Sequence, residues 1–190
     1  MSDPKHKGSI CNGTGDKRDA TDFYETPSGF TAELLRREKF HHKIWECAAG
    51  AGAISKVLHN FGYQVLSTDL EPRSPLVSKA DFFEMEARGY DIVTNPPFKL
   101  LIPFAVRGFK LCHRKMALCM YISGLNSSSR YQSIWSKFPV SRIMLAGRYQ
   151  QINSTRGLIS SQCSHIWVVF DKAHQGKPTF EWFPDVVYSC

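Results

Sequence analysis

The sequence has 190 residues, which is enough for one hydrophobic core but short for two comfortable domains. Its apolar content of 43% and aromatic content of 13% are typical of a globular protein and exclude a disordered chain. No apolar run approaches the roughly 20 residues that span a bilayer, and the first residues lack the apolar core of a secretion signal. We therefore expect a cytoplasmic protein with no membrane partner. The net charge of +7 favours partners that carry phosphates, such as nucleic acids.

The cysteines and histidines show no pattern typical of a metal site. The six cysteines include no Cys-x-x-Cys pair, and Cys47, Cys112 and Cys119 lie within apolar segments, which favours buried free thiols over disulfides or zinc. The seven histidines have no ligand spacing, and the adjacent His41 and His42 cannot both face one site on a regular element. We expect no bound metal.

Helical and strand patterns alternate after a polar start. Residues 1–20 are rich in Gly, Lys, Asp and Asn, which indicates a flexible tail before a single domain over residues 21–190. Apolar residues at helical spacing predict helices over residues 31–39, 55–61, 100–112 and 131–138. Short apolar runs predict strands over residues 43–48, 63–67, 81–83, 90–94, 116–122, 140–145 and 165–170. Residues 146–164 are polar and punctuated by glycine, so we expect a loop there.

Polar or glycine-rich residues follow several of the predicted strands. Strands that are apolar along their length and alternate with helices are typical of a parallel sheet covered on both faces. In such sheets, ligands bind outside the carboxyl ends of the strands. Four of these ends carry polar or glycine-rich groups, namely the AAGAG turn of residues 48–52, Thr68-Asp69, Asp81, and Asn95 followed by Pro96-Pro97. The sequence therefore predicts a ligand site at this edge of the sheet.

The residues at these strand ends suit a ligand with ribose and adenine groups. Gly50 and Gly52 let the backbone approach a ligand closely, although tight strand-to-helix turns also use glycine, and the turn matches neither a P-loop nor G-x-G-x-x-G. Asp69 can accept hydrogen bonds from both ribose hydroxyls, or serve as a helix cap. Asp81, beside the apolar Phe82, can accept from an adenine amine, or be an ordinary turn aspartate.

Five segments give the chain a resemblance to a known enzyme family. They are DFYETP at residues 22–27, ECAAGAG at 46–52, TDL at 68–70, ADFF at 80–83 and NPPF at 95–98. Through them, residues 22–170 resemble the class I S-adenosylmethionine-dependent methyltransferases, specifically small phage-type enzymes that methylate adenine in DNA. The resemblance implies an α/β, Rossmann-like fold with a seven-stranded, mostly parallel sheet, a reversed last strand and helices on both faces. It also implies S-adenosylmethionine as cofactor, and a bacterial or phage-infected cell as the setting.

The resemblance assigns roles to particular residues of these segments. The cofactor-binding residues that it implies are Tyr24, Thr26, Pro27, Glu46, Ala48, Gly50, Gly52, Asp69, Leu70, Asp81, Phe82 and Asn95. The catalytic residues that it implies are Asn95, Pro96, Pro97 and Phe98. For residues 24–27 the alternative is a plain turn before a helix. The glycine segment departs from the family because it lacks the aromatic residue often found there, and Phe98 replaces the commoner tyrosine.

The NPPF segment suggests a way to activate a poor nucleophile. The side-chain oxygen of Asn95 and the backbone carbonyl of Pro96 can accept the two hydrogens of an exocyclic amine, while Pro97 stiffens the turn. Holding both hydrogens frees the lone pair of the nitrogen. Phe98 would stack on a base extruded from the duplex, although a core aromatic beneath the loop is the alternative.

The substrate is expected to be DNA, with RNA as the second choice. The expected nucleic-acid contacts are Lys99, Arg130, Arg148, Tyr149 and Arg156, the last three in the substrate-contact loop predicted over residues 146–164. An ordinary solvated loop is the alternative there. Relatives with the same tetrapeptide modify an amine in RNA or a protein glutamine, and a nucleotide-binding module without catalysis is a further alternative.

Overall fold

The computed structural model of the protein describes residues 25–147, 150–153, 157–160 and 164–183. Its α-helices are α1 (Ser28–Arg37), α2 (Ala53–Asn60), α3 (Leu101–Leu111) and α4 (Ser128–Arg130), with 3-10 helices η1 (Phe98–Leu100) and η2 (Ile122–Leu125) and a π-helix η3 (Tyr131–Trp135). Its strands are β1 (Lys43–Glu46), β2 (Gln64–Asp69), β3 (Ser78–Lys79), β4 (Asp91–Thr94), β5 (Lys115–Tyr121), β6 (Val140–Ala146), β7 (Gln150–Asn153), β8 (Gly157–Ser160), β9 (His165–Asp171) and β10 (Thr179–Phe183).

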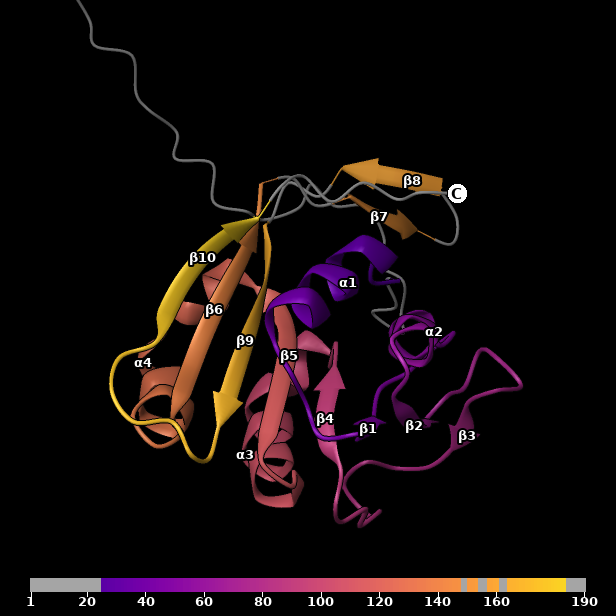
Figure 1. The fold of residues 1–190 in the computed structure, drawn as a ribbon, viewed down its shortest axis with the longest axis horizontal. Helices are drawn as coiled ribbons and strands as arrows, with labels where there is room; N and C mark the ends of the chain where they lie inside the picture. The colour runs from indigo at the N-terminus through magenta and orange to yellow at the C-terminus, as the bar shows by residue number, and fades with distance from the viewer. Residues whose placement is uncertain (1–24, 148–149, 154–156, 161–163, 184–190) are drawn as a thin grey trace, which may run out of the picture.

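An eight-stranded sheet in the order β10-β6-β9-β5-β4-β1-β2-β3 forms the centre of the molecule (Figure 1). Strand β9 runs antiparallel to β5 and β6, and every other pairing in this sheet is parallel. The expected mostly parallel sheet is therefore confirmed, and the expected strand, HIWVVF in β9, is the reversed one, although β10 follows it in the chain. The expected number of seven strands is wrong, because the aromatic-rich segment TFEWF pairs with β6 as an additional edge strand.

Helices cover both faces of the sheet, as expected (Figure 1). Helix α1 buries Phe30, Leu34 and Leu35, at the spacing of one helical face, in a cluster with Ile44 and Val93. On the opposite face, α3 buries a stripe that contacts Ile92, Met116 and Leu118, and its members are Leu101, Phe104, Ala105, Gly108 and Leu111. Neighbouring strand residues alternate between the two clusters, because successive side chains of a strand point to opposite faces.

Three predicted elements differ from the structure. The third strand is Ser78–Lys79 rather than residues 81–83, because Asp81 begins a turn in which its carbonyl accepts from the Glu84 and Met85 N–H groups. The predicted loop over residues 146–164 contains the antiparallel pair β7 and β8. The predicted helix over residues 131–138 starts earlier, where Ser127 caps α4, and continues as the π-helix η3.

The longest helix in the described ranges, α3, has 11 residues. A bilayer-spanning helix needs roughly 20. None of the helices in these ranges combines the length and the apolar character that a membrane span requires.

Candidate active site

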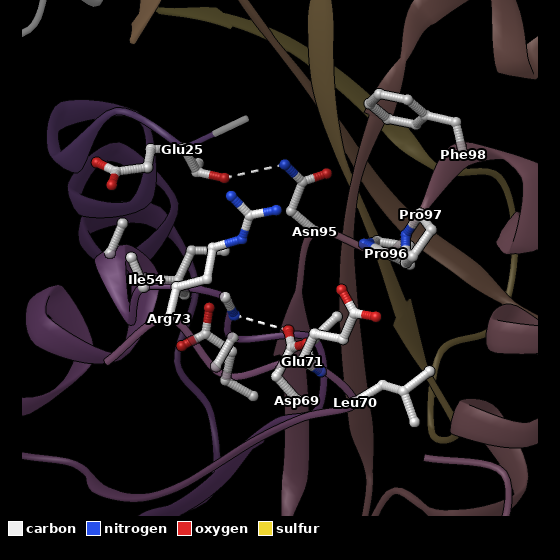
Figure 2. Close-up of a pocket in the computed structure, with 17 residues that line it drawn as sticks. Glu25, Ile54, Asp69, Leu70, Glu71, Arg73, Asn95, Pro96, Pro97 and Phe98 are labelled. Carbon is white, nitrogen blue, oxygen red and sulfur yellow. Dashed lines mark hydrogen bonds between the residues drawn. The ribbon is translucent and has the colours of Figure 1, made fainter. Parts of the chain in front are cut away.

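A cavity of about 310 Å³ opens at the carboxyl ends of β1, β2 and β4, at the edge where the sequence predicts a ligand site (Figure 2). The predicted residues that line it are Thr26, Glu46, Ala48, Gly50, Asp69, Leu70, Asn95, Pro96, Pro97 and Phe98. Parallel pairing of β1 with both β2 and β4 explains why residues so far apart in the chain meet here.

The glycine turn after β1 is tied to the end of β2. Gly50 and Gly52 have positive φ angles of 53° and 85°, which a residue with a side chain rarely adopts. The Gly50 N–H donates to Asp69 Oδ2 at 2.7 Å, and the Ala49 N–H donates to the Thr68 carbonyl at 3.0 Å. Gly52 does not line the cavity, and it instead starts α2. The turn therefore holds one wall of the cavity at a fixed distance from Asp69.

The Asp69 carboxylate stands between the glycine turn and the loop after β2. Its Oδ2 accepts from Gly50 N and its Oδ1 accepts from the Glu71 N–H at 2.8 Å. A carboxylate has about four acceptor positions, so each oxygen keeps capacity for a further donor such as a ribose hydroxyl. Leu70, with 59% of its surface exposed, offers an apolar side chain next to this carboxylate.

Arg73 lines the cavity although the sequence analysis did not select it. Its N–H donates to the Gly50 carbonyl at 3.0 Å, so the loop after β2 folds back over the glycine turn. Its guanidinium lies between Asp69 and Asn95 in Figure 2. Further lining residues missed in the sequence are Glu25, Ala49, Ala51, Ala53, Ile54 and Glu71. Their place in the chain could have indicated them, because each of these residues lies within three residues of a predicted site residue.

Glu46 is a buried carboxyl at the wall of the cavity. Burial raises the pKa of Glu46 to about 8, although the hydrogen bond from the Ser55 hydroxyl opposes this shift. The Ser55 and Ser67 hydroxyls lie 2.5 Å apart, so β1, α2 and β2 meet in one polar cluster. Near neutral pH this carboxyl is therefore mostly protonated and uncharged.

Asn95 has one partnered end and one open end. Its Nδ2 donates to the hydroxyl of the buried Thr26 at 3.1 Å, which fixes the orientation of the amide. Its Oδ1 is buried and has no hydrogen-bond partner among the described residues. In Figure 2 this oxygen lies on the side of the Asn95 amide that faces Phe98, away from the dashed hydrogen bond. Because an unpaired buried acceptor costs free energy, the arrangement indicates a donor supplied by a ligand.

The Phe98 ring packs into a small aromatic group. It lies 4.1 Å from the Tyr121 ring and 5.9 Å from the His165 ring, and the Tyr121 and His165 rings are 4.4 Å apart (centroid distances). Tyr121 and His165 face each other in the β5–β9 register. They were not selected from the sequence, because only the antiparallel pairing brings them together. Phe98 itself is half-buried and lines the cavity.

Other predicted site residues lie apart from the cavity. Pro27 precedes α1, where its carbonyl accepts from the Phe30 N–H. The Asp81 carboxylate accepts from the Phe83 N–H at 2.7 Å, and Phe82 is buried in the core against Phe104. Asp81 and Phe82 do not line the cavity, so their cofactor role stays a prediction.

The predicted nucleic-acid contacts are divided by the described ranges. Lys99 is exposed in η1, directly after Phe98, and Arg130 is half-buried at the end of α4. The predicted residues Tyr24, Arg148, Tyr149 and Arg156 lie outside the described residues. Within the described part of the chain, no group of three or more His, Cys, Asp or Glu residues is placed to hold a metal ion.

The sequence matches no protein-family model and no curated protein. The backbone is similar to a Pyrococcus horikoshii protein assigned as an RNA methyltransferase, with 14% identity, a TM-score of 0.59, and coverage of 76% of this chain and 81% of that chain. A Listeria monocytogenes protein assigned as a class I S-adenosylmethionine-dependent methyltransferase gives 13% identity, a TM-score of 0.60, and coverage of 86% and 66%.

A third similar structure is the modification subunit assigned to a type I restriction enzyme of Vibrio vulnificus. It gives 12% identity, a TM-score of 0.55, and coverage of 85% of this chain and 47% of that chain. At these identities the similarity concerns the fold. The chain has the class I S-adenosylmethionine-dependent methyltransferase fold, with a mixed sheet of eight strands between layers of helices.

Proposed function

We propose that the protein transfers a methyl group from S-adenosylmethionine to the exocyclic N6 amine of adenine in DNA. The observation that carries this proposal is the buried Oδ1 of Asn95, which has no partner in the described residues and adjoins the cavity and Phe98. An acceptor held in this way suits a ligand that brings an N–H group.

The cavity residues fit the cofactor. Asp69 keeps acceptor capacity for ribose hydroxyls, and the positive-φ Gly50 lets the backbone approach them closely. Leu70 would lie against the adenine ring, and Glu46 would lie at the methionine end as a neutral carboxyl or, beside an ammonium, as a carboxylate. When bound, S-adenosylmethionine supplies a methyl group on a sulfonium, whose carbon is electrophilic.

The NPPF segment would prepare the amine. The lone pair of an adenine amine is delocalised into the ring, which makes the nitrogen a poor nucleophile. Asn95 Oδ1 would accept one amine hydrogen and the Pro96 carbonyl the other, which favours a tetrahedral nitrogen with a free lone pair. Pro96 and Pro97 have no backbone N–H, so neither of them can donate to those two acceptors. The nitrogen loses one proton overall, and this proton must pass to water because an amide oxygen is too weak a base to keep it.

The Phe98 ring would hold the base in place. Base–aromatic stacking contributes about 1–3 kcal/mol per base, and the Tyr121 and His165 rings pack on Phe98 and help to hold it. In duplex DNA the target adenine must first leave the base stack.

A nucleic-acid substrate is supported by charge and by the similar structures. The net charge is +7, and Lys99 is exposed beside Phe98. The similar structures include one named for RNA methylation and one named as a restriction modification subunit. The first of these favours an amine in RNA as the second candidate, because most of that chain is covered.

The test is methyl transfer from labelled S-adenosylmethionine to duplex DNA, single-stranded DNA, ribosomal RNA and a glutamine-containing peptide. We expect label in DNA, and N6-methyladenine after hydrolysis and mass spectrometry. Label in RNA or the peptide but not in DNA would overturn the DNA assignment. Cofactor binding by calorimetry with no transfer to any substrate would indicate a nucleotide-binding module instead.

A further inference from the structure

Two short helices carry exposed apolar side chains on the rim beside Phe98. Leu100, the last residue of η1, is 42% exposed, and Ile122, the first residue of η2, is 37% exposed. Neither residue lines the cofactor cavity. They lie directly next to it in the chain, since Leu100 comes two residues after Phe98 and Ile122 follows Tyr121.

Helix η2 lies close to the start of α3, which directly follows η1. A Cβ added to Gly124 of η2 would lie 3.7 Å from Leu101 Cδ2, an ordinary van der Waals distance, so η2 is a neighbour of the residue that follows Leu100. The Phe98 and Tyr121 rings are in contact at 4.1 Å, just before the two exposed residues. Leu100 and Ile122 therefore belong to one surface, and Phe98 lies beside it.

The backbone of both residues is fixed. The Leu100 N–H donates to the Pro97 carbonyl at 2.8 Å, and the Ile122 N–H donates to the Ser164 carbonyl at 2.9 Å. Single exposed apolar side chains are common and need no explanation. Here two of them are held rigidly at the mouth of a candidate active site, with the exposed Lys99 between Phe98 and Leu100. Two apolar side chains next to a cation suit a partner that offers an apolar gap beside phosphates.

An adenine that leaves a duplex leaves a gap behind it. The gap is bounded above and below by the apolar faces of the neighbouring bases and at its sides by phosphates. Apolar side chains are known to enter base steps as wedges, where they replace part of the lost stacking. A lysine beside such a wedge can meet a phosphate.

We propose that Leu100 and Ile122 form an apolar wedge that enters duplex DNA at the target base and fills the space left by the extruded adenine. This inference rests on the proposed function, because it has Leu100 and Ile122 contact the substrate of that same active site. It makes the substrate a duplex, since a single strand offers no gap to fill. A glutamine side chain on a protein likewise needs no wedge.

The test compares duplex and single-stranded DNA of identical sequence as substrates of the double variant Leu100→Ala/Ile122→Ala. We expect kcat/KM on the duplex to fall about tenfold or more, because extrusion loses its compensation, while kcat/KM on the single strand changes less than about twofold. Activity on the single strand also reports that the variant is folded. Phe61→Ala is the matched control, since Phe61 is 41% exposed and follows α2 at the end opposite the glycine turn; it should leave both values unchanged.

A third substrate separates the wedge from general duplex binding. In a duplex with an abasic site opposite the target adenine, extrusion costs less, so the double variant should recover most of the wild-type rate. If the wild-type protein methylates DNA but the double variant keeps the wild-type ratio of kcat/KM on the duplex to kcat/KM on the single strand, the wedge is overturned. The proposed function then still holds. No transfer to either form of DNA by the wild-type protein would overturn both.

Discussion

The two ends of strand β4 use buried polar side chains in opposite ways. At the amino end, the Asp91 carboxylate is buried and accepts three backbone N–H groups, from His41 at 2.7 Å, Arg114 at 2.9 Å and Lys115 at 2.8 Å. At the carboxyl end, just four residues later, the Asn95 amide donates to the Thr26 hydroxyl, and its buried oxygen has no hydrogen-bond partner among the described residues.

The difference separates a group that serves the fold from one kept for a ligand. Asp91 joins β4 to two other segments of the chain, because it bonds His41 in the loop before β1 and the adjacent Arg114 and Lys115 at the start of β5. Its acceptor capacity is largely used within the protein. Asn95 is held by Thr26 in one orientation and leaves an acceptor open at the cavity. Substitution of Asp91 should therefore change the stability of the protein, whereas substitution of Asn95 should change its activity.

The largest expected effect is on catalysis, from Asn95→Ala. Loss of the open acceptor should lower kcat by about 10²–10³-fold, similar to removal of one oriented polar group from other active sites. The free energy of unfolding should change by less than about 1 kcal/mol, since only the bond to Thr26 is lost. Single-turnover methylation and urea unfolding measure the two quantities.

Asn95→Asp is the matched control for that prediction. Aspartate keeps a side-chain acceptor at the same position, so more of the activity should remain than with alanine. Cofactor affinity by calorimetry should stay close to the wild-type value in both variants. Full turnover by Asn95→Ala would remove Asn95 from the catalytic role.

The second effect is on stability, from Asp91→Ala at the other end of β4. Three buried N–H groups would lose their acceptor, which we expect to cost about 3 kcal/mol of unfolding free energy. Asp91→Asn should cost less, because the amide oxygen can still serve the Arg114 and Lys115 N–H groups. Turnover per folded molecule should stay within about twofold of wild type. A loss of turnover without a loss of stability would contradict the comparison.

The third effect concerns Glu46, which lies at the carboxyl end of β1 and lines the same cavity as Asn95. Its pKa of about 8 in the folded protein compares with an ordinary value of 4.5. The unfolded chain therefore releases this proton at a lower pH than the folded chain, and stability falls as pH rises from about 4.5 to about 8. Glu46→Gln removes this dependence, so relative to wild type it should gain about 3 kcal/mol between about pH 5.5 and about pH 8.

Urea unfolding of the cofactor-free protein at both pH values measures this difference. Glu71→Gln is the control, because Glu71 also lines the cavity but is exposed, and its substitution should keep the wild-type pH dependence. Parallel pH profiles for wild type and Glu46→Gln would show that burial of Glu46 does not limit stability.

The parts of the molecule that could be predicted from the sequence are those in which an apolar run in the sequence corresponds to a buried strand in the structure. Strands β4, β5 and β9 are buried along nearly their whole length, and each appears in the sequence as a continuous apolar run. The strand ends that carry Gly50, Asp69 and Asn95 were found because a parallel sheet brings its carboxyl ends to one edge. The pattern in the sequence and the packing lead to the same result at these positions.

The remaining parts depend on contacts between distant segments. Strand β3 has two exposed residues and no periodicity, so only its pairing with β2 defines it. Strand β10 exists through its register with β6, and four of its five residues are not buried. His165 reaches Phe98 only because β9 is reversed, which places its first residue opposite Tyr121 at the carboxyl end of β5. Such pairings carry no local signal in a single sequence.

The smallest expected effect is that of Phe98→Leu, which tests whether Phe98, three residues after Asn95, also contacts the substrate. Loss of the ring removes base stacking of about 1–2 kcal/mol, so KM for DNA should rise about tenfold while kcat falls less. The ring contact with Tyr121 is also lost, at a cost of about 1 kcal/mol in stability. Phe109→Leu is the matched control, since Phe109 packs on Phe138 at 4.6 Å and lies outside the cavity. It should show a similar loss of stability without a change in KM. An equal KM in both variants would place Phe98 with Asp91, among the residues that serve the fold.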